Sequence, residues 1–408
     1  MAGKKKVAYL HVGLHKTGTT ALQLWLQKNR DYLQANNLKY LEFSFLDNDC
    51  PNHSIPFYFI YSEAREKYHI TIREQLDASE YKNLFRLQLE TNLKTNNNII
   101  ISGEDISKLQ MSELQSLKQT LIDNGFTINT VVFVRSPYTL INSLFQEYVK
   151  SNMRTPNLSH LLTEQRQDLQ KISKIFNKLE IVSYDKCNTN KLGVIGTFLS
   201  ILNLHPTDIV IINQNISLSQ NAIRLMDHIN TFEPFIINGK KNARRNNNDL
   251  IALHKICGRR FRLSESEINP LKKILEQEAL FINNLTGTFF SNTIEFEEEI
   301  IWNDTSIDQL LDALEAIPNN LLVHVYSYFY TENNIPDTLR AKVLDAIKHF
   351  NLNNSLEIFV ENFRDMALSI ESHNLQKAIR FMKLAETIRP NGPLIKARNI
   401  YYKNLLKQ

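Results

Sequence analysis

Two short segments of the chain combine backbone geometry and side chains that suit the binding of an anion. The first is the turn from Gly13 to Thr20, which is rich in glycine and threonine and contains one lysine, Lys16. A turn of this kind between a strand and a helix presents unpaired backbone N–H groups at the positive end of the helix dipole. We therefore expect a phosphate or sulfate group to bind there, with Lys16 supplying a positive charge.

The second segment starts at Arg135 and contains Ser143 eight residues later. Ser136 has the character of a helix N-cap and Pro137 that of a first helical residue, so a second helix N-terminus is expected there. A guanidinium group forms two parallel charge-assisted hydrogen bonds with a phosphate. The second segment is therefore expected to place an arginine beside another helix N-terminus that follows a strand.

The spacing of Gly13 and Gly18 is that of the phosphate loop of kinases and nucleotide triphosphatases. In that motif a lysine follows the second glycine, but here the residue after Gly18 is Thr19. The lysine of this turn lies two positions before Gly18 instead. The sequence therefore disfavours a P-loop-type kinase or triphosphatase, which stays an alternative.

Transfer of a group to a hydroxyl requires a base that accepts the hydroxyl proton. Glu104 and Asp105 follow a predicted strand, and the carboxyl end of a strand is where an α/β sheet assembles its site. Glu104 is the leading candidate, although either carboxylate could instead cap the next helix. His53 is a second candidate because the pKa of imidazole suits the task.

The turn that begins at Lys16 resembles the 5′-phosphosulfate loop of sulfotransferases that use 3′-phosphoadenosine 5′-phosphosulfate (PAPS). The resemblance implies that Lys16 reaches the oxygen that bridges phosphorus and sulfur, and that no metal is needed. It also implies a set of donor-binding residues in this turn, which are His15, Lys16, Thr17, Gly18, Thr19 and Thr20.

Arg135 and Ser143 match the two positions that bind the 3′-phosphate in these sulfotransferases, while Leu140 and Phe145 depart from the common pattern. Glu104 stands where sulfotransferases of glycans carry a catalytic glutamate. The resemblance therefore implies in-line transfer of a sulfuryl group to a carbohydrate hydroxyl, with a bacterial surface polysaccharide or glycolipid as acceptor.

The elements that must position these residues are short apolar strands that alternate with helical patterns. Continuous apolar strands of this kind indicate a parallel sheet with both faces covered. The sequence thus predicts an α/β fold with a P-loop-like parallel sheet flanked by helices. The expected strands are Val7–Val12, Asn98–Ser102, Asn129–Val134 and Leu179–Ser183.

The last hundred residues show helical patterns without a strand signal, so we expect a sulfotransferase domain over residues 1–300 and an all-α domain over 301–408. Ala378, Met382, Ala385 and Pro390 have the spacing of the second helix of a tetratricopeptide repeat, although an ordinary helical hairpin fits equally well. A protein partner could bind these helices. A third class of function is therefore a scaffold protein that acts through this tail and whose α/β domain is a degenerate enzyme.

Composition restricts the remaining possibilities. A net charge of +4 disfavours binding to nucleic acid, although the basic cluster of Lys240, Lys241, Arg244 and Arg245 could be a solvated turn or hold a phosphate or an acidic glycan. Three widely spaced cysteines indicate neither a disulfide framework nor a zinc site. No apolar stretch approaches the roughly 20 residues of a membrane helix. We expect a cytoplasmic enzyme, with association to a membrane surface left open.

Overall fold

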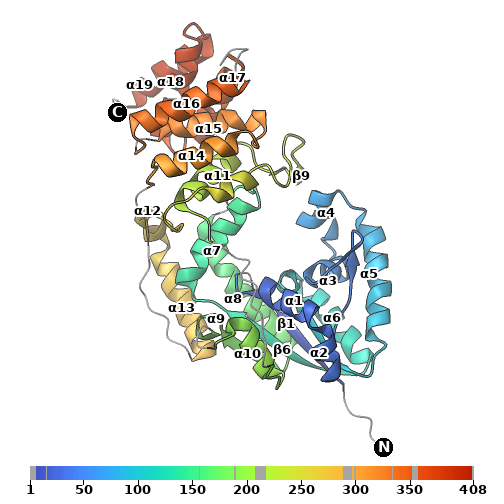
Figure 1. Cartoon of the computed structure of the whole chain (residues 1–408). Helices are drawn as coiled ribbons and strands as arrows, with labels where there is room; N and C mark the ends of the chain where they lie inside the picture. Colours follow the sequence, from blue (N-terminus) through green and yellow to red (C-terminus); the bar gives the residue numbers. More distant parts are fainter. Residues whose placement is uncertain are drawn as a thin grey trace, which may run out of the picture. The chain divides into compact units, whose positions relative to one another are not determined.

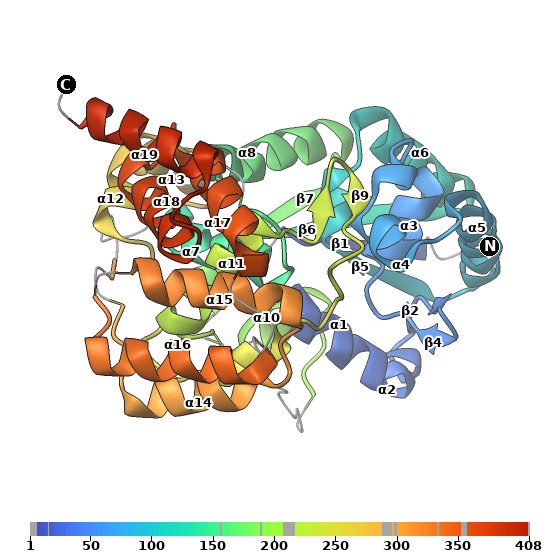
Figure 2. The same cartoon turned by 90° about the horizontal axis from the view of Figure 1, so that it is seen from above.

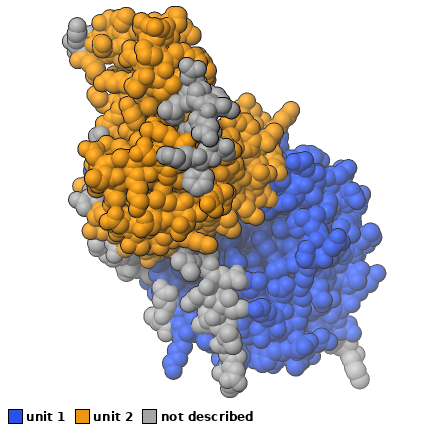
Figure 3. Space-filling view, turned by 45° about the horizontal axis from the view of Figure 1, so that its top comes forward, with its two compact units in different colours: residues 1–145, 156–216, 266–295 blue, residues 146–155, 217–265, 296–408 orange. Residues whose placement is uncertain are grey.

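The computed structural model describes residues 6–14, 16–155, 157–187, 190–206, 217–287, 296–297, 300–332, 334–351 and 357–406 (Figure 1). Its contacts divide the chain into two units, each built from three stretches of sequence (Figure 3). The first unit comprises residues 1–145, 156–216 and 266–295, and the second comprises residues 146–155, 217–265 and 296–408.

A five-stranded sheet forms the centre of the first unit, and all of its strand pairs are parallel. The four strands expected from the sequence are present, so the predicted parallel α/β sheet is confirmed. The sheet gains a fifth, edge strand of three residues, which is too short for periodicity to reveal. In order across the sheet, the strands are β2 (Leu38–Tyr40), β5 (Asn98–Gly103), β1 (Lys6–Val12), β6 (Phe126–Val134) and β7 (Leu179–Ser183).

Helices cover both faces of this sheet, which explains why its strands are apolar on both sides. On β1, Leu10 and Val12 face one buried core, while Tyr9 packs against the other. Figure 2 shows α6 and α8 on one side of the sheet and α1 and α10 on the other. The first core is covered by α3 (Ser54–Tyr61), α5 (Ala78–Leu93), α6 (Met111–Asp123), α8 (Leu158–Ile175) and α13 (Lys272–Thr286), and the second by α1 (Thr19–Lys28), α2 (Arg30–Ala35) and α10 (Gly193–Ile201).

The carboxyl ends of the strands lie at one edge of the sheet because the strands are parallel. There β1 leads to α1, β5 to a short 3-10 helix, β6 to α7 (Pro137–Lys150) and β7 to α9 (Tyr184–Cys187). Both predicted candidate segments therefore start at this edge. Shorter elements in the first unit are β3 (Ser44–Phe45), β4 (Asn48–Asp49), α4 (His69–Glu74) and the 3-10 helices η1 (Arg65–Lys67), η2 (Asp105–Lys108) and η4 (Asn269–Leu271).

The second unit is mainly helical. Its helix α11 (Gln220–Phe232) packs against α15, and a two-strand hairpin follows α11 in sequence. The remaining elements are β8 (Ile236–Ile237), β9 (Lys240–Lys241), η3 (Ile251–Lys255), α12 (Glu265–Ile268), α14 (Asp304–Leu314), α15 (Asn319–Thr331), α16 (Asp337–Asn351), α17 (Glu357–Ile370), α18 (Leu375–Ile388) and α19 (Pro393–Leu405). Only the first residue of α12 belongs to this unit, because the stretch 217–265 ends there.

The division by packing does not coincide with the expected boundary at residue 300. Residues 217–265 share a unit with the C-terminal helices because polar and apolar groups of α11 are buried against α15. His228 Nε2 lies 2.9 Å from Ser327 Oγ, and both side chains are buried. The chain thus enters the helical unit well before residue 300.

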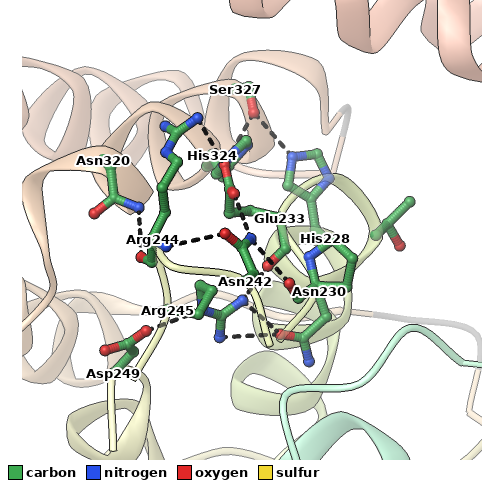
Figure 4. A network of polar contacts seen from close by, with 12 residues as sticks. His228, Asn230, Glu233, Asn242, Arg244, Arg245, Asp249, Asn320, His324 and Ser327 are labelled. Atoms are coloured by element: carbon green, nitrogen blue, oxygen red, sulfur yellow. Dashed lines mark hydrogen bonds and ion pairs between the residues drawn. The ribbon is translucent and has the colours of Figure 1, made fainter. Parts of the chain in front are cut away.

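A buried polar network in the second unit contains Arg245, one residue of the basic cluster at residues 240–245 (Figure 4). The Arg245 side chain is 1% exposed, and its Nε donates to Asp249 Oδ2 at 3.0 Å. Its Nη1 donates to Asn230 Oδ1 at 3.3 Å and to the Glu233 carbonyl. Arg245 is therefore a buried structural residue and does not contribute to the basic surface that the sequence suggested.

The small residues expected at a close helix contact lie on α18. Ala378, Met382 and Ala385 are all fully buried, and α18 packs against both α17 and α19. The assignment to a tetratricopeptide repeat stays a prediction. Among the described residues, no helix combines the length and apolar character that crossing a membrane requires.

Candidate functional site

The turn between β1 and α1 has the strand–turn–helix geometry expected of an anion loop. The Gly13 N–H donates to the Gly103 carbonyl at 3.1 Å, which ties the start of the turn to the end of β5. Thr17 Oγ1 donates to the Leu14 carbonyl at 2.6 Å, which holds the turn closed. Gly18, with φ of 80°, and Lys16, with φ of 67°, adopt the left-handed conformation that reverses the chain direction before α1.

Both glycines of the turn are required by close packing. A Cβ atom on Gly13 would lie 2.6 Å from Thr19 Oγ1 and 3.2 Å from Glu104 Cγ. A Cβ atom on Gly18 would lie 3.2 Å from the Tyr184 ring and would also be strained by the positive φ. The turn is therefore in direct contact with side chains from the ends of β5 and β7.

Thr19 has a buried polar group at the start of α1. Its side chain is 1% exposed, and its Oγ1 has no hydrogen-bond partner among the described residues. A buried hydroxyl without a partner costs about 1–3 kcal/mol. Because Thr19 is the first residue of α1, an anion bound at this N-terminus could accept a hydrogen bond from its hydroxyl.

The other loop residues expected to bind the donor divide into several groups. Lys16 is partly buried, and Thr20 is exposed. The Thr17 hydroxyl donates its hydrogen bond within the turn itself. His15 lies outside the described residues. Lys16 and the Thr19 hydroxyl, together with the backbone N–H groups of the turn, remain the predicted anion-binding groups.

Arg135 brings the second segment into contact with the first. Its Nη1 donates to the Lys16 carbonyl at 3.1 Å, and its Nε donates to Thr139 Oγ1 at 3.0 Å. The guanidinium also stacks on Tyr184, with Cζ 5.5 Å from the ring centroid. Tyr184 therefore touches both the loop glycine Gly18 and the arginine, and it was not among the predicted site residues.

The first turns of α7 present a polar face and an apolar face. Thr139 and Ser143, four residues apart, lie one turn from each other on the polar face that starts at Arg135. Leu140 is 3% exposed and lines a small cavity with Leu14 and Leu161. Position 140, where the family pattern has a second arginine, points into the protein here, so leucine is the residue that fits.

Glu104 and Asp105 have different surroundings although they are neighbours. The Glu104 side chain passes Gly13, since its Cγ would touch a Cβ atom on that residue. The carboxylate of Asp105 accepts a 2.7 Å hydrogen bond from the buried Tyr68 hydroxyl, whose pKa is raised well above its usual value by burial and by Asp105. Of the two carboxylates, Glu104 is the one whose side chain contacts the anion loop.

His53, the second candidate base from the sequence, lies in surroundings typical of a structural histidine. Its side chain is fully buried, its Nδ1 accepts a hydrogen bond from the Ser102 N–H at 3.1 Å, and its Nε2 donates to the Leu41 carbonyl at 3.0 Å. Burial lowers its pKa to about 3. His53 is a structural histidine that joins β5 to the segment after β2.

A second buried histidine lies on β1. His11 is fully buried, its Nδ1 lies 2.8 Å from Ser102 Oγ, and burial lowers its pKa to about 3. Its ring packs edge-on against Phe133 at 5.3 Å between ring centroids. His11 therefore belongs to the core on the α1 side of the sheet.

These two histidines predict that acid destabilises the first unit. In the unfolded chain an imidazole binds a proton near pH 6.5, but in the folded protein His11 and His53 bind one only near pH 3. Between these values the unfolded state holds more protons, so the free energy of unfolding falls as the pH falls. From pH 7.5 to 5.5 we expect a loss of about 1.4 kcal/mol for each histidine, measured by urea unfolding.

The contribution of His53 is isolated by comparison with the variant His53→Gln. The destabilisation caused by this variant is expected to shrink by about 1.4 kcal/mol from pH 7.5 to 5.5, because the variant cannot take up the proton. His160→Gln, which changes an exposed histidine of the same unit, is the matched control. A His53→Gln destabilisation that stays constant across this range would refute the assignment.

Metal ligation has no support in the described part of the chain, where no group of three or more His, Cys, Asp or Glu side chains is suited to hold an ion. The residues that the structure brings together are Lys16, Thr19, Glu104 and Arg135, with Tyr184 added. They come from the ends of four strands that are adjacent in the sheet, β5, β1, β6 and β7. This arrangement suits an extended ligand with more than one anionic group.

No protein-family model and no curated protein matches this sequence. Among solved structures, the chain is similar to a sulfotransferase from Alicyclobacillus acidocaldarius, with 10% identity, coverage of 70% of this chain and 97% of that chain, and a TM-score of 0.39. It is similar to the sulfotransferase domain of the Synechococcus PCC 7002 olefin synthase, with 12% identity, coverage of 67% and 96%, and a TM-score of 0.30. A structure of the PezAT toxin–antitoxin system of Streptococcus pneumoniae gives 15% identity, coverage of 48% and 79%, and a TM-score of 0.26. Similarities this distant assign no activity, which must be inferred from the contacts of the site.

Proposed function

We propose that this protein is a sulfotransferase that uses PAPS as donor. The observation that carries the proposal is the contact between Arg135 and the Lys16 carbonyl at 3.1 Å. It joins two helix N-termini that follow neighbouring parallel strands, β1 and β6. Two anion-binding turns held this close fit one nucleotide with a phosphate at each of two positions, as PAPS has at its 5′ and 3′ positions.

The residues of the first turn supply the chemistry of the leaving group. Lys16, the Thr19 hydroxyl and the N-terminus of α1 would hold the 5′-phosphosulfate. During transfer the acceptor oxygen bonds to sulfur while the bond from sulfur to the bridging oxygen breaks, so negative charge develops on the phosphate. A cation aimed at that oxygen stabilises the transition state more than the ground state.

Glu104 would accept the proton of the acceptor hydroxyl. The products are then a sulfate ester and adenosine 3′,5′-bisphosphate, and the proton resides on the carboxyl group until solvent removes it. The two backbone hydrogen bonds of His53 support a structural role for this residue and favour Glu104 as the base. Asp105 accepts a hydrogen bond from Tyr68, whereas the Glu104 side chain lies beside Gly13 of the anion loop, which supports Glu104 as the proposed base.

The acceptor that we propose is a carbohydrate hydroxyl, in a bacterial surface polysaccharide or glycolipid. This choice rests on the resemblance of Glu104 and of the segment after Arg135 to sulfotransferases of glycans. The balanced charge and the widely spaced cysteines support a cytoplasmic location. The helices α14–α19 are the proposed surface for a protein partner.

The proposal is tested by the binding of adenosine 3′,5′-bisphosphate, measured by calorimetry, and by transfer of label from PAPS to a panel of glycans. We expect Arg135→Ala to weaken the binding of the bisphosphate by about 100-fold, since a charge-assisted bidentate contact is worth roughly 3 kcal/mol. The binding of adenosine 5′-monophosphate should change much less, because it lacks the 3′-phosphate.

Arg73→Ala, which removes a partly exposed arginine of the first unit outside this site, is the matched control and should bind both nucleotides as the wild type does. A wild-type protein that binds adenosine 3′,5′-bisphosphate no better than the monophosphate would contradict the proposal. Magnesium-dependent hydrolysis of ATP or GTP would favour the kinase or triphosphatase class instead.

A further inference from the structure

A single side-chain amide holds both ends of the Arg135 backbone. Gln165 lies on α8 and is 6% exposed. Its Oε1 accepts the Arg135 N–H at 3.1 Å, and its Nε2 donates to the Arg135 carbonyl at 3.1 Å. The amide therefore makes the two backbone hydrogen bonds that a neighbouring strand would make with Arg135 if β6 continued for one more residue.

This clamp lies where the chain has no regular structure of its own. Strand β6 ends at Val134 and α7 begins at Pro137, so Arg135 and Ser136 form the whole connection. Asp185 Oδ2 accepts the Ser136 N–H at 2.9 Å, which fixes the second of these two residues. Both backbone supports come from helices that flank the site, α8 and α9.

The position of the Arg135 backbone decides where its guanidinium lies. The side chain reaches from this connection to the Lys16 carbonyl and the Tyr184 ring. A functional group that is displaced by about 1 Å can lose as much as 100-fold in its contribution. A residue that fixes the backbone of Arg135 therefore acts on whatever Arg135 binds.

We propose that Gln165 is a positioning residue that sets the selectivity of the site for a nucleotide with a 3′-phosphate, acting through Arg135. This inference rests on the proposed function. It goes beyond that function because it assigns a role to Gln165, which acts through the Arg135 backbone. Its effect is expected in donor affinity and not in turnover at saturating donor.

The test is the variant Gln165→Glu, which has nearly the same shape. It keeps the oxygen that accepts the Arg135 N–H but places a second oxygen 3.1 Å from the Arg135 carbonyl, where the amide donated. We expect the Kd for adenosine 3′,5′-bisphosphate to rise by about 10-fold, since a displaced Arg135 loses part of its contribution to binding. The Kd for adenosine 5′-monophosphate should change by less than about 2-fold, and kcat at saturating PAPS should stay near the wild-type value.

The chain offers a matched control in Asn92→Asp. Asn92 on α5 is 5% exposed and clamps the backbone of Glu42 in the same way, with Oδ1 accepting the N–H at 3.1 Å and Nδ2 donating to the carbonyl at 2.6 Å. The same chemical change there should lower stability in urea without altering the ratio of the two nucleotide affinities. Gln165→Met, which removes both hydrogen bonds without adding a charge, replaces Gln165→Glu if that variant does not fold.

The possible outcomes separate this inference from the proposed function. Equal affinities of the wild type for the two nucleotides would refute the proposed function. If the wild type prefers the bisphosphate and the Gln165 variants keep that preference, then Gln165 does not position Arg135 and the inference is wrong. If Asn92→Asp also lost the preference for the bisphosphate, the effect of the Gln165 variants would be general destabilisation. That result would also refute the inference.

Discussion

Replacing Lys16 with alanine should lower kcat for sulfuryl transfer by about 10²–10³-fold, as removal of one preorganised donor at a developing charge does in other enzymes. The affinity for adenosine 3′,5′-bisphosphate should fall much less, because the lysine acts mainly on charge that appears during bond breaking. The measurement is single-turnover transfer of labelled sulfate at saturating donor, together with calorimetry of nucleotide binding.

Lys28→Ala is the matched control for this experiment, since Lys28 is an exposed lysine at the other end of the same helix, α1. It should leave both kcat and affinity at the wild-type values. Wild-type turnover in Lys16→Ala would show that the leaving phosphate is stabilised by other groups. In that case the anion loop would be a binding element only.

Replacing Glu104 with glutamine should lower kcat by about 10²–10⁴-fold, the usual contribution of a positioned general base. Glutamine keeps the size of the side chain beside Gly13 but does not take up the proton of the acceptor hydroxyl. Donor affinity should stay unchanged. The measurement is the initial rate at saturating PAPS and acceptor, together with calorimetry of donor binding.

Asp105→Asn is the informative comparison because it changes the neighbouring carboxylate in the same way. An asparagine oxygen can still accept the hydrogen bond from Tyr68, so we expect both the fold and the activity to be retained. If Asp105→Asn lost transfer and Glu104→Gln kept it, the roles that we assign to the two residues would be reversed. Glu90→Gln on the exposed face of α5 controls for the loss of a surface charge.

The sheet was predictable because its signals are local. An apolar run such as residues 98–102 has few alternatives to a buried strand, and the pair Ser136 and Pro137 marks a helix start by its own chemistry. The strand–turn–helix geometry of the loop at Lys16 was predictable for the same reason, whereas its role in binding a donor stays a prediction. The expectation for Arg135 followed from its place at the end of such a strand.

Residues that act through distant partners were not predictable. Gln165 lies 30 positions from Arg135, and an isolated glutamine on an amphipathic helix shows no pattern. His53 had the right chemistry for a base, but only the fold reveals that the backbone of residues 41 and 102 occupies both ring nitrogens. Arg245 likewise appeared to be part of a basic surface until its burial beside Asp249 was seen.

The division by packing differs from the predicted domain boundary for a related reason, because the sequence pattern changes near residue 300 while the packing division does not follow it. The segment 217–265 contains no feature that separates it from the α/β unit by sequence alone. Its buried partners, such as Ser327, lie about a hundred residues further along the chain. A contact over such a distance leaves no trace in local periodicity.

The interleaving of the two units affects how the protein folds during its synthesis. Residues 217–265 leave the ribosome before the helices at 304–405 that share their unit, and at about 5–20 residues per second the wait lasts several seconds or more. In that interval α15 has not yet been synthesised, so the apolar face of α11 that packs against it is exposed. Exposed apolar surface on a nascent chain promotes aggregation. We expect chaperones that shield such surface to bind the growing chain at this stage, when most of the α/β unit has already been made.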